Sequence, residues 1–283
     1  PVLFQRLLAA KERTGASIVV VDPRRSATAD AADLVLPIAP DGDVALFAGL
    51  HAHLVANGHA DAGFAQHLSG GPAPDLAAVA AATNLPARDI AAFYALFAGT
   101  EKVVTVWSQG VNQSSCGTDK VNAILNCHLV TGRIGRPGMG PFSVTGQPNA
   151  MGGREVGGLA NTLAAHMDIE DARARDRVQR FWSAPAIAAR PGLKAVDLFR
   201  AVADGRIRAL WIMGTNPAVS MPRADDVAAA IAACPFVVVS DVVRDTDTAG
   251  LAQVLLPAAA WGEKDGTVTN SERRISRVRA AVP

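Results

Sequence analysis

Cysteine is scarce in this sequence, and its spacing excludes several kinds of site. Only three cysteines, Cys116, Cys127 and Cys234, occur among the 283 residues, and no two of them form a CxxC pair. Disulfide frameworks, structural zinc sites and iron–sulfur clusters need more cysteines at closer spacing. We therefore expect small, buried cysteines and no metal site built from them.

Long apolar runs and an excess of one charge are also absent. No run approaches the ~18 apolar residues of a membrane span, and no basic segment followed by an apolar region begins the chain. The 27 basic and 26 acidic residues leave a formal net charge of +1, which provides no field to attract nucleic acid or an anionic membrane. The sequence predicts a globular protein of a soluble compartment, most simply the cytoplasm, with no nucleic-acid or membrane partner.

Several familiar catalytic and binding motifs are missing as well. The sequence has no GxGxxG and no GxxxxGK[ST], so an ordinary dinucleotide fold or a P-loop lacks support. It has no GxSxG turn for a serine hydrolase. His51 and His53 stand two apart in a helical pattern, where they cannot converge on one metal ion.

Alternating strand and helix patterns predict an α/β fold with parallel sheets. The 49 % hydrophobic content is enough for a substantial core. Helical patterns cover residues 3–13, 43–57, 75–97, 118–131, 168–182, 195–204 and 223–234, and strand patterns cover residues 17–22, 102–107, 208–213, 236–241 and 253–256. The first strand, SIVVVD, is a continuous β-branched run typical of strands covered on both faces.

Polar residues follow four of these strands. They are Asp22-Pro23-Arg24-Arg25, Ser108 to Gln113, Gly214-Thr215-Asn216-Pro217, and Ser240-Asp241. Ligands of open parallel sheets bind beyond the carboxyl ends of the strands, so four polar clusters at one sheet edge favour a nucleotide-containing ligand. Each position also has an ordinary interpretation: Asp22 could cap its turn, and Asn216-Pro217 could begin a helix.

A glycine-rich stretch, residues 132–158, holds nine of the 25 glycines and little regular helix or strand pattern. Loops of this length are usually functional or disordered. Closely spaced glycines let backbone N–H groups approach an anion, while Gln147, Asn149 and Arg154 suit a polar heterocycle or a phosphate. The alternative is an irregular structural loop between two layers.

The motifs, taken in order, resemble molybdenum enzymes that carry a bis(molybdopterin guanine dinucleotide) cofactor, most closely the assimilatory nitrate reductase catalytic subunits. Four blocks carry the resemblance: VVDPRRS at residues 20–26, the block at residues 107–161, ALWIMGTNPAVSMP at residues 209–222, and WGEKDGTVTNSERR at residues 261–274. VDPR and GTNP occur across the wider superfamily, including formate dehydrogenases, so they indicate the cofactor class more than the substrate. The chain has PDGD where related sequences often have PGTD.

The resemblance implies roles for particular residues. One guanine nucleotide arm would contact Asp22, Pro23, Arg24, Gly42 and Asp43. Gln109 and Gln113 would approach the pterin near the metal, in the same neighbourhood as the stretch from Gln147 to Arg154. The other nucleotide arm and its phosphates would contact Asn216, Ser240, Asp241 and Lys264.

The resemblance also implies that the chain is the central part of a longer protein. Residues 1–106 would be the C-terminal part of one α/β cofactor-binding domain, and residues 107–283 a segment of a second. The [4Fe–4S] cysteine motif and the molybdenum ligand would lie upstream of Pro1, so no catalytic residue is assigned.

The expected activity is reduction of nitrate to nitrite, with electrons from a ferredoxin, a flavodoxin or a nicotinamide-dependent reductase subunit. A formate dehydrogenase-like oxidoreductase and a non-catalytic nucleotide-binding module are the alternatives.

Overall fold

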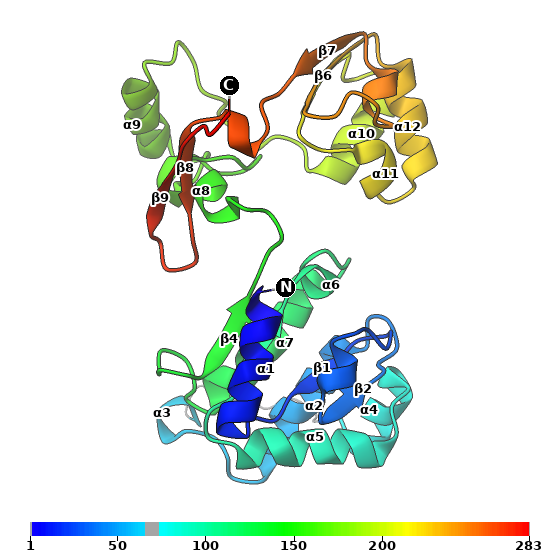
Figure 1. Ribbon diagram of the computed structural model, residues 1–283, viewed down its shortest axis with the longest axis vertical. Coiled ribbons are helices and arrows are strands. Elements are labelled where there is room, and N and C mark those ends of the chain that lie inside the picture. Colours follow the sequence, from blue (N-terminus) through cyan, green and yellow to red (C-terminus); the bar gives the residue numbers. More distant parts are fainter. Residues whose placement is uncertain (1, 66–73, 283) are drawn as a thin grey trace. The chain divides into compact units, whose positions relative to one another are not determined.

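Among the described residues, hydrophobic side chains gather in one core in the first half of the chain and in two separate cores in the second half. The computed structural model describes residues 2–65 and 74–282 (Figure 1). The chain divides into two compact units, unit 1 with residues 1–146 and unit 2 with residues 147–283. The sequence-based boundary at residue 106 concerns the domains of a longer protein and stays a prediction.

The described part of unit 1 contains two pairs of parallel strands. β1 (Val19–Val21) pairs with β2 (Leu34–Leu36), and β3 (Val104–Trp107) pairs with β4 (Gly140–Ser143). The parallel α/β architecture expected from the sequence is therefore confirmed.

The helices of unit 1 surround these strands. They are α1 (Val2–Thr14), α2 (Asp43–Ala56), α3 (Ala62–Ala65), α4 (Leu76–Thr83), α5 (Ala87–Gly99), α6 (Gln109–Asn112) and α7 (Gly117–Val130), with a 3₁₀ turn, η1 (Ala29–Ala31). α2 packs against α7, α4 and α5, and Leu46, Leu50 and Ile124 are completely or almost completely buried between them. This helical layer supports the strands that carry the candidate site.

The helix expected over residues 75–97 is interrupted. α4 ends at Thr83 and α5 begins at Ala87. Asn84 adopts a left-handed conformation with φ 56°, and Pro86, which lacks an N–H group, precedes α5. An alanine-rich pattern therefore hid two helices joined by a tight turn.

The glycine-rich stretch is more regular than its composition indicates. β4 forms within it because Gly140, with φ 120°, donates its N–H to the Val103 carbonyl at 2.8 Å. A short helix, α8 (Ala150–Glu155), follows. The expectation of little regular structure was wrong here, since pairing with a distant strand cannot be read from local composition.

Unit 2 contains a three-stranded parallel sheet. Its strands are β5 (Ala209–Met213), β6 (Phe236–Asp241) and β7 (Val254–Pro257), in the order β5-β6-β7. The helices α10 (Ala195–Ala203), α11 (Pro217–Ser220) and α12 (Ala224–Ala233) and the turn η3 (Ala249–Leu251) accompany it. Ile231, Val237 and Val239 are fully buried in its core.

The rest of unit 2 joins the end of the glycine-rich stretch to the C-terminal region. Here β8 (Gly266–Thr269) and β9 (Ile275–Val278) form an antiparallel hairpin beside α8. The remaining elements are η2 (Ala164–His166), α9 (Ala172–Trp182) and η4 (Trp261–Glu263). The sequence analysis did not identify β8 and β9.

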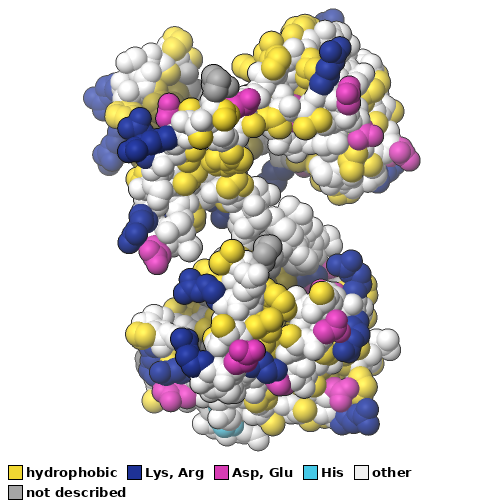
Figure 2. All heavy atoms as spheres, in the orientation of Figure 1, with side chains coloured by type: hydrophobic (Ala, Val, Ile, Leu, Met, Phe, Trp, Pro, Cys, Tyr) yellow, Lys and Arg dark blue, Asp and Glu magenta, His cyan; other side chains and the backbone are white. Residues whose placement is uncertain are grey.

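The sequence predicted that the four polar strand ends share one sheet edge. In the structure they do not. Within the described residues, β1 and β3 belong to separate pairs, and only β5 and β6 are neighbours in one sheet. Continuous β-branched runs identify strands but not their partners. Figure 2 shows lysine and arginine side chains scattered among acidic ones on the visible face of the molecule.

Candidate functional site

The first polar cluster is a turn that follows β1. Asp22 donates its N–H to the Leu36 carbonyl at 3.3 Å, and its Oδ1 accepts the Arg24 N–H at 2.8 Å. Asp22 therefore caps its turn, as one of the two interpretations expected, but it uses only one carboxylate oxygen to do so. The other oxygen makes no hydrogen bond within the described residues, and Pro23 and Arg24 are exposed beside it.

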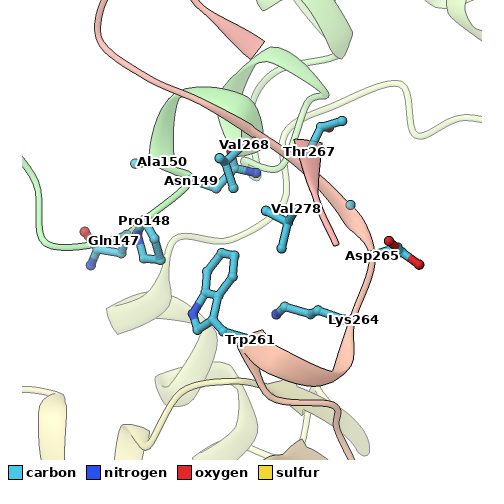
Figure 3. A pocket seen from close by; sticks show the side chains of 11 residues that line it. Gln147, Pro148, Asn149, Ala150, Trp261, Lys264, Asp265, Thr267, Val268 and Val278 are labelled. Carbon is cyan, nitrogen blue, oxygen red and sulfur yellow. The ribbon is translucent and has the colours of Figure 1, made fainter. Parts of the chain in front are cut away.

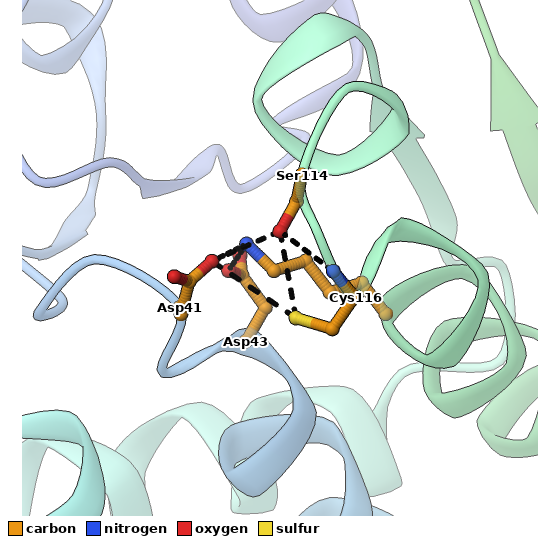
Figure 4. A network of polar contacts seen from close by, with 5 residues as sticks. Asp41, Asp43, Ser114 and Cys116 are labelled. Atoms are coloured by element: carbon orange, nitrogen blue, oxygen red, sulfur yellow. Dashed lines mark hydrogen bonds and ion pairs between the residues drawn. The ribbon is translucent and has the colours of Figure 1, made fainter. Parts of the chain in front are cut away.

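The PDGD turn lies in front of α2 and is held by a buried lysine (Figure 4). The side chain of Lys120, on α7, is only 3 % exposed, and its Nζ lies 2.8 Å from Asp41 Oδ1 and 2.9 Å from Asp43 Oδ2. Asp41 adopts φ 68°. A Cβ on Gly42 would lie 2.9 Å from Ile38 Cγ1, so only glycine fits there without movement.

Two further side chains from the loop before α7 complete this network. Ser114 donates its hydroxyl to Asp41 Oδ1 at 2.9 Å, and Cys116 Sγ lies 3.4 Å from Ser114 Oγ and 4.0 Å from Asp41 Oδ1. Cys127 and Cys234 are buried as expected, whereas Cys116 is only partly buried in this polar cluster. The expectation of a buried Cys116 was therefore wrong.

Lys120 and Asp41 stabilise each other's charged forms. Burial opposes the charge of the Lys120 ammonium, but the hydrogen bonds that it donates to Asp41 and Asp43 outweigh this and raise its pKa. The hydrogen bonds from Lys120 and then Ser114 lower the pKa of Asp41. The contact with Lys120 holds the Asp43 side chain in place at the start of α2.

Gln109 and Gln113 both belong to the segment after β3. Gln109 begins α6, and the exposed Gln113 follows its last residue and donates its N–H to the Gln109 carbonyl at 2.9 Å. Asn112 accepts the Trp107 Nε1–H at 3.0 Å and donates to Ser143 Oγ at 3.2 Å, which ties α6 to the ends of β3 and β4. The two glutamines therefore lie on a short helix fixed above the β3–β4 pair.

In unit 2, Asn216 links the end of β5 to the turn η3. Its Oδ1 accepts the Thr248 N–H at 3.1 Å and hydroxyl at 2.6 Å, and its Nδ2 donates to Asp247 Oδ2 at 3.3 Å. The buried Thr248 hydroxyl in turn accepts the Ala218 N–H at 3.1 Å. Asn216 precedes α11 as expected for a cap, but the side chain that accepts a helix N–H is that of Thr248.

Ser240 and Asp241 end β6, next to the end of β5. Ser240 Oγ accepts the Trp211 Nε1–H at 2.9 Å, and Asp241 Oδ1 accepts the N–H groups of Val242 and Val243 at 2.7 and 3.3 Å. The structure therefore brings Asn216, Ser240 and Asp241 to the carboxyl edge of one parallel sheet.

Lys264 and Gln147 line a cavity of about 390 Å³ elsewhere in unit 2 (Figure 3). The Lys264 ammonium lies 4.4 Å from the centre of the Trp261 ring, and that ring is half exposed. Asn149 is fixed because its Oδ1 accepts the Thr269 N–H at 2.9 Å. Arg154, further along α8, is exposed and does not line the cavity.

The sequence analysis missed three residues that shape these sites: Lys120, Trp261 and Thr248. For Lys120 a signal existed, because it shares one helix face with Ala123, Ile124 and Cys127, which are all buried. A single charge in such a stripe indicates a buried ion pair. For Trp261 and Thr248 no local pattern distinguishes these residues from ordinary packing residues.

The described residues offer neither a metal site nor a membrane-spanning helix. No group of three His, Cys, Asp or Glu side chains could hold a metal ion within residues 2–65 and 74–282. In the same ranges, the helices are too short or too polar to cross a lipid bilayer.

Comparison with known families identifies the class of protein. The family model described as molybdopterin oxidoreductase matches residues 1–283. Since the match covers the whole chain, the chain belongs to the molybdopterin oxidoreductase family, as the sequence motifs indicated.

Within this family the chain is similar to nitrate reductases. It is 53 % identical over 287 residues to a nitrate reductase of Klebsiella oxytoca, covering 100 % of this chain and 33 % of the relative. It is 49 % identical over 292 residues to a nitrate reductase of Shewanella frigidimarina, covering 100 % of this chain and 31 % of the relative. The chain therefore spans about a third of these relatives.

More distant matches extend the comparison. The F420-dependent formate dehydrogenase 2 subunit alpha of Methanococcus maripaludis is 31 % identical over 290 residues, covering 100 % of this chain and 42 % of the relative. Among solved structures, acetylene hydratase from Pelobacter acetylenicus matches with a TM-score of 0.69 at 18 % identity, covering 99 % of this chain and 42 % of that chain. At that identity the likeness concerns the fold alone.

Proposed function

We propose that this chain is the central part of a molybdenum-dependent nitrate reductase catalytic subunit that reduces nitrate to nitrite. The observation that carries the proposal is the 53 and 49 % identity to nitrate reductases over the whole chain. The identity to a formate dehydrogenase is 31 % over the same span. Oxidation of formate is accordingly the second candidate, and a non-catalytic nucleotide-binding module is the third.

The proposed cofactor is molybdenum bis(molybdopterin guanine dinucleotide). In unit 1, one guanine nucleotide arm is held by Asp22, Pro23, Arg24, Gly42 and Asp43. The Asp22 carboxylate fits this role, because one of its oxygens remains for a purine amino edge. Gly42 is required by close packing against Ile38 at the start of α2, which fixes the turn beside the proposed site. Lys120 fixes the turn that carries Asp43.

In unit 2, the other nucleotide arm and its phosphates are held by Asn216, Ser240, Asp241 and Lys264. Lys264 supplies a cation beside a cavity with an exposed aromatic face, which suits a phosphate or the rim of a heterocycle. The side chains of Asn216 and Ser240 are already hydrogen-bonded within the protein, so their role is to fix the backbone that meets the ligand. The hydrogen bonds of Asp241 among the described residues use Oδ1, which leaves Oδ2 for the ligand.

Gln109 and Gln113 of unit 1 would approach the pterin near the metal with their side-chain amides. Gln147 and Arg154 of unit 2 would offer an amide and a guanidinium group to the same cofactor. When bound, the molybdenum supplies the redox chemistry that takes an oxygen atom from nitrate, while this chain binds and orients the cofactor. We place the molybdenum ligand and a [4Fe–4S] cluster in other parts of the longer protein.

Electron donor and location follow from the same proposal. Electrons come from a ferredoxin, a flavodoxin or a nicotinamide-dependent reductase subunit, and the protein works in the cytoplasm in nitrate assimilation. An assimilatory nitrate reductase of Haloferax mediterranei is 35 % identical to the chain, and a periplasmic nitrate reductase of Desulfovibrio desulfuricans is 34 % identical. Cell fractionation distinguishes the two locations.

The proposal is tested with the enzyme made from the complete reading frame. Reduced viologen is offered with nitrate, and oxidised viologen with formate. Nitrate-dependent oxidation of the dye is expected. Turnover of formate alone would mean that formate, and not nitrate, is the substrate. No turnover of either compound by molybdenum-loaded protein would favour the non-catalytic module.

The cofactor form and one of its contacts have a separate test. Acid hydrolysis of the purified protein is expected to release GMP together with pterin. Asp22→Asn keeps an oxygen for the Arg24 N–H but removes the carboxylate, so the GMP and molybdenum retained should fall about 10-fold or more, as for a lost charged hydrogen bond. Asp30→Asn, at an exposed aspartate whose partner Arg25 is also exposed, is the matched control. Pterin without GMP would exclude the dinucleotide form.

A further inference from the structure

An apolar groove separates the two strand pairs of unit 1. It has a volume of about 500 Å³ and is lined by Val19 and Val21 of β1 on one side and by Val104 and Val106 of β3 on the other. The sheet fragments therefore lie in the order β2, β1, groove, β3, β4. The two strands within each pair are parallel. In each pair the strand that comes first in the sequence, β1 or β3, borders the groove, and the later strand, β2 or β4, lies on its outer side.

The two strands that border the groove direct hydrogen-bonding groups into it. Ile18 and Asp22 bond to β2 through the Leu34 N–H and the Leu36 carbonyl. Because the bonding direction alternates along a parallel strand, the N–H and C=O groups of Val19 and Val21 point the other way. The same reasoning applies to β3, where the Val103 and Trp107 carbonyls accept N–H groups next to or within β4, so Val104 and Val106 face the groove.

The surroundings of the groove are those of a sheet interior. On the helical side it is lined by Phe47, Phe93 and Phe97, which are buried in the core of unit 1. In the view of Figure 1, α1 passes in front of the region between β4 and β1. α1 has no buried residue, and Leu3 is 57 % exposed, while Figure 2 shows hydrophobic side chains on the face of unit 1 over which α1 runs.

A missing central strand accounts for all of these features. Doubly wound sheets of the dinucleotide-binding type have the strand order 3-2-1-4-5, in which the first strand lies in the middle. If β1, β2, β3 and β4 are the second, third, fourth and fifth strands, the groove holds the place of the first. A helix that follows the first strand and leads into the second covers the sheet as a right-handed crossover, and α1 is the helix that leads into β1.

We propose that this groove binds a β-strand, parallel to β1 and β3, from the segment of the longer protein that leads into α1. The strand pairs with the backbone groups of Val19, Val21, Val104 and Val106, and its apolar side chains cover the phenylalanines below and meet α1 above. The inference rests on sheet geometry and holds whatever the substrate is.

The inserted strand also completes the candidate cofactor edge of unit 1. Ligands of such sheets bind at the point where the strand order reverses, beyond the carboxyl ends of the two central strands. In unit 1 that point lies between the inserted strand and β3, beside Ser108 and Gln109.

Two measurements on the complete protein test this inference. Amide hydrogen exchange, resolved to single residues, reports whether the groove is paired. The amides of Val104 and Val106 are expected to exchange at least about 100-fold more slowly than unprotected amides. The Thr105 and Trp107 amides, which face β4, are internal references.

The second measurement identifies the occupant. A photoreactive diazirine residue of about leucine size replaces Val106, and the cross-linked peptide is sequenced. A peptide from the same chain shortly before α1 is expected. The control is the same residue at Val219, an exposed valine of α11, which should not label that peptide.

Three outcomes would overturn the inference. Unprotected amides at Val104 and Val106 would mean that no strand is paired there. A cross-link to a different region of the same chain would assign the groove to another segment. A cross-link between two chains would make it a contact between copies.

Discussion

The buried ion pair between α7 and the PDGD turn supplies a quantitative test of how unit 1 is held together. Lys120→Met keeps most of the side-chain volume and removes the ammonium that faces Asp41 and Asp43. Breaking a fully buried pair costs about 3–5 kcal/mol, because a charge is left without its partner. Asp41 is 61 % exposed and recovers hydration, whereas Asp43 is only 19 % exposed, so we expect a loss of about 2–3 kcal/mol.

Native-state hydrogen exchange measures this loss where it occurs. In the complete protein, the amides of α2 and α7 should exchange about 30 to 150 times faster in the variant, the factor that corresponds to 2–3 kcal/mol of local stability. Lys11→Met is the matched control. Lys11 pairs with Asp33 at 2.7 Å, but both side chains are about a third or more exposed, so the change should stay below about 1 kcal/mol.

The stability lost in Lys120→Met should depend on pH. Lys120, followed by Ser114, lowers the pKa of Asp41 below its ordinary value of 3.8. The stability from this carboxylate is present above pH 3.8 and is lost as the pH falls through the lowered pKa. The difference between Lys120→Met and the unmodified protein should therefore be largest near neutral pH and shrink below about pH 4. Adding Asp43→Asn to Lys120→Met should recover part of the loss.

Equal exchange rates in the variant and the unmodified protein at neutral pH would refute this reasoning. So would equal effects of Lys120→Met and Lys11→Met. In either case the carboxylates would be hydrated well enough that the buried ammonium contributes nothing beyond a surface ion pair.

Two other predictions follow from buried polar groups. His128 is fully buried, and burial, followed by the charge of Arg133, lowers its pKa from 6.5 to about 4. Stability should fall as the pH drops from about 6.5 to 4, by about 3 kcal/mol in total, and His128→Asn should reduce this fall in thermal unfolding measured across that range. Asn216→Ala leaves the Thr248 N–H without its acceptor and should cost about 1–3 kcal/mol, measured as faster amide exchange in α11 and η3.

Matched variants decide how these two results are interpreted. His59→Asn, at an exposed histidine, is the matched control for His128→Asn. An acid response of His128→Asn identical to that of the unmodified protein would mean that other groups cause it. Asn57→Ala removes an exposed amide at the end of α2. If both asparagine variants lost the same stability, Asn216 would not stabilise the protein by linking the end of β5 to η3.

The sequence alone determined the class of fold and most of the elements. The strand expected over residues 236–241 is β6, and the helices expected over residues 43–57 and 118–131 are α2 and α7, within one residue at each end. Hydrophobic periodicity and caps act over a few residues, so they can be read locally. Family membership was likewise readable, because its motifs are continuous blocks.

Only the tertiary structure decided which strands are neighbours and which side chains meet. β4 forms because β3 lies beside it, and Gln147 lines one cavity with Lys264 although more than a hundred residues separate them. Lys120 is buried because the PDGD turn, far away in the sequence, supplies two carboxylates. Such contacts depend on packing and backbone pairing between distant segments, and no local pattern of residues specifies them.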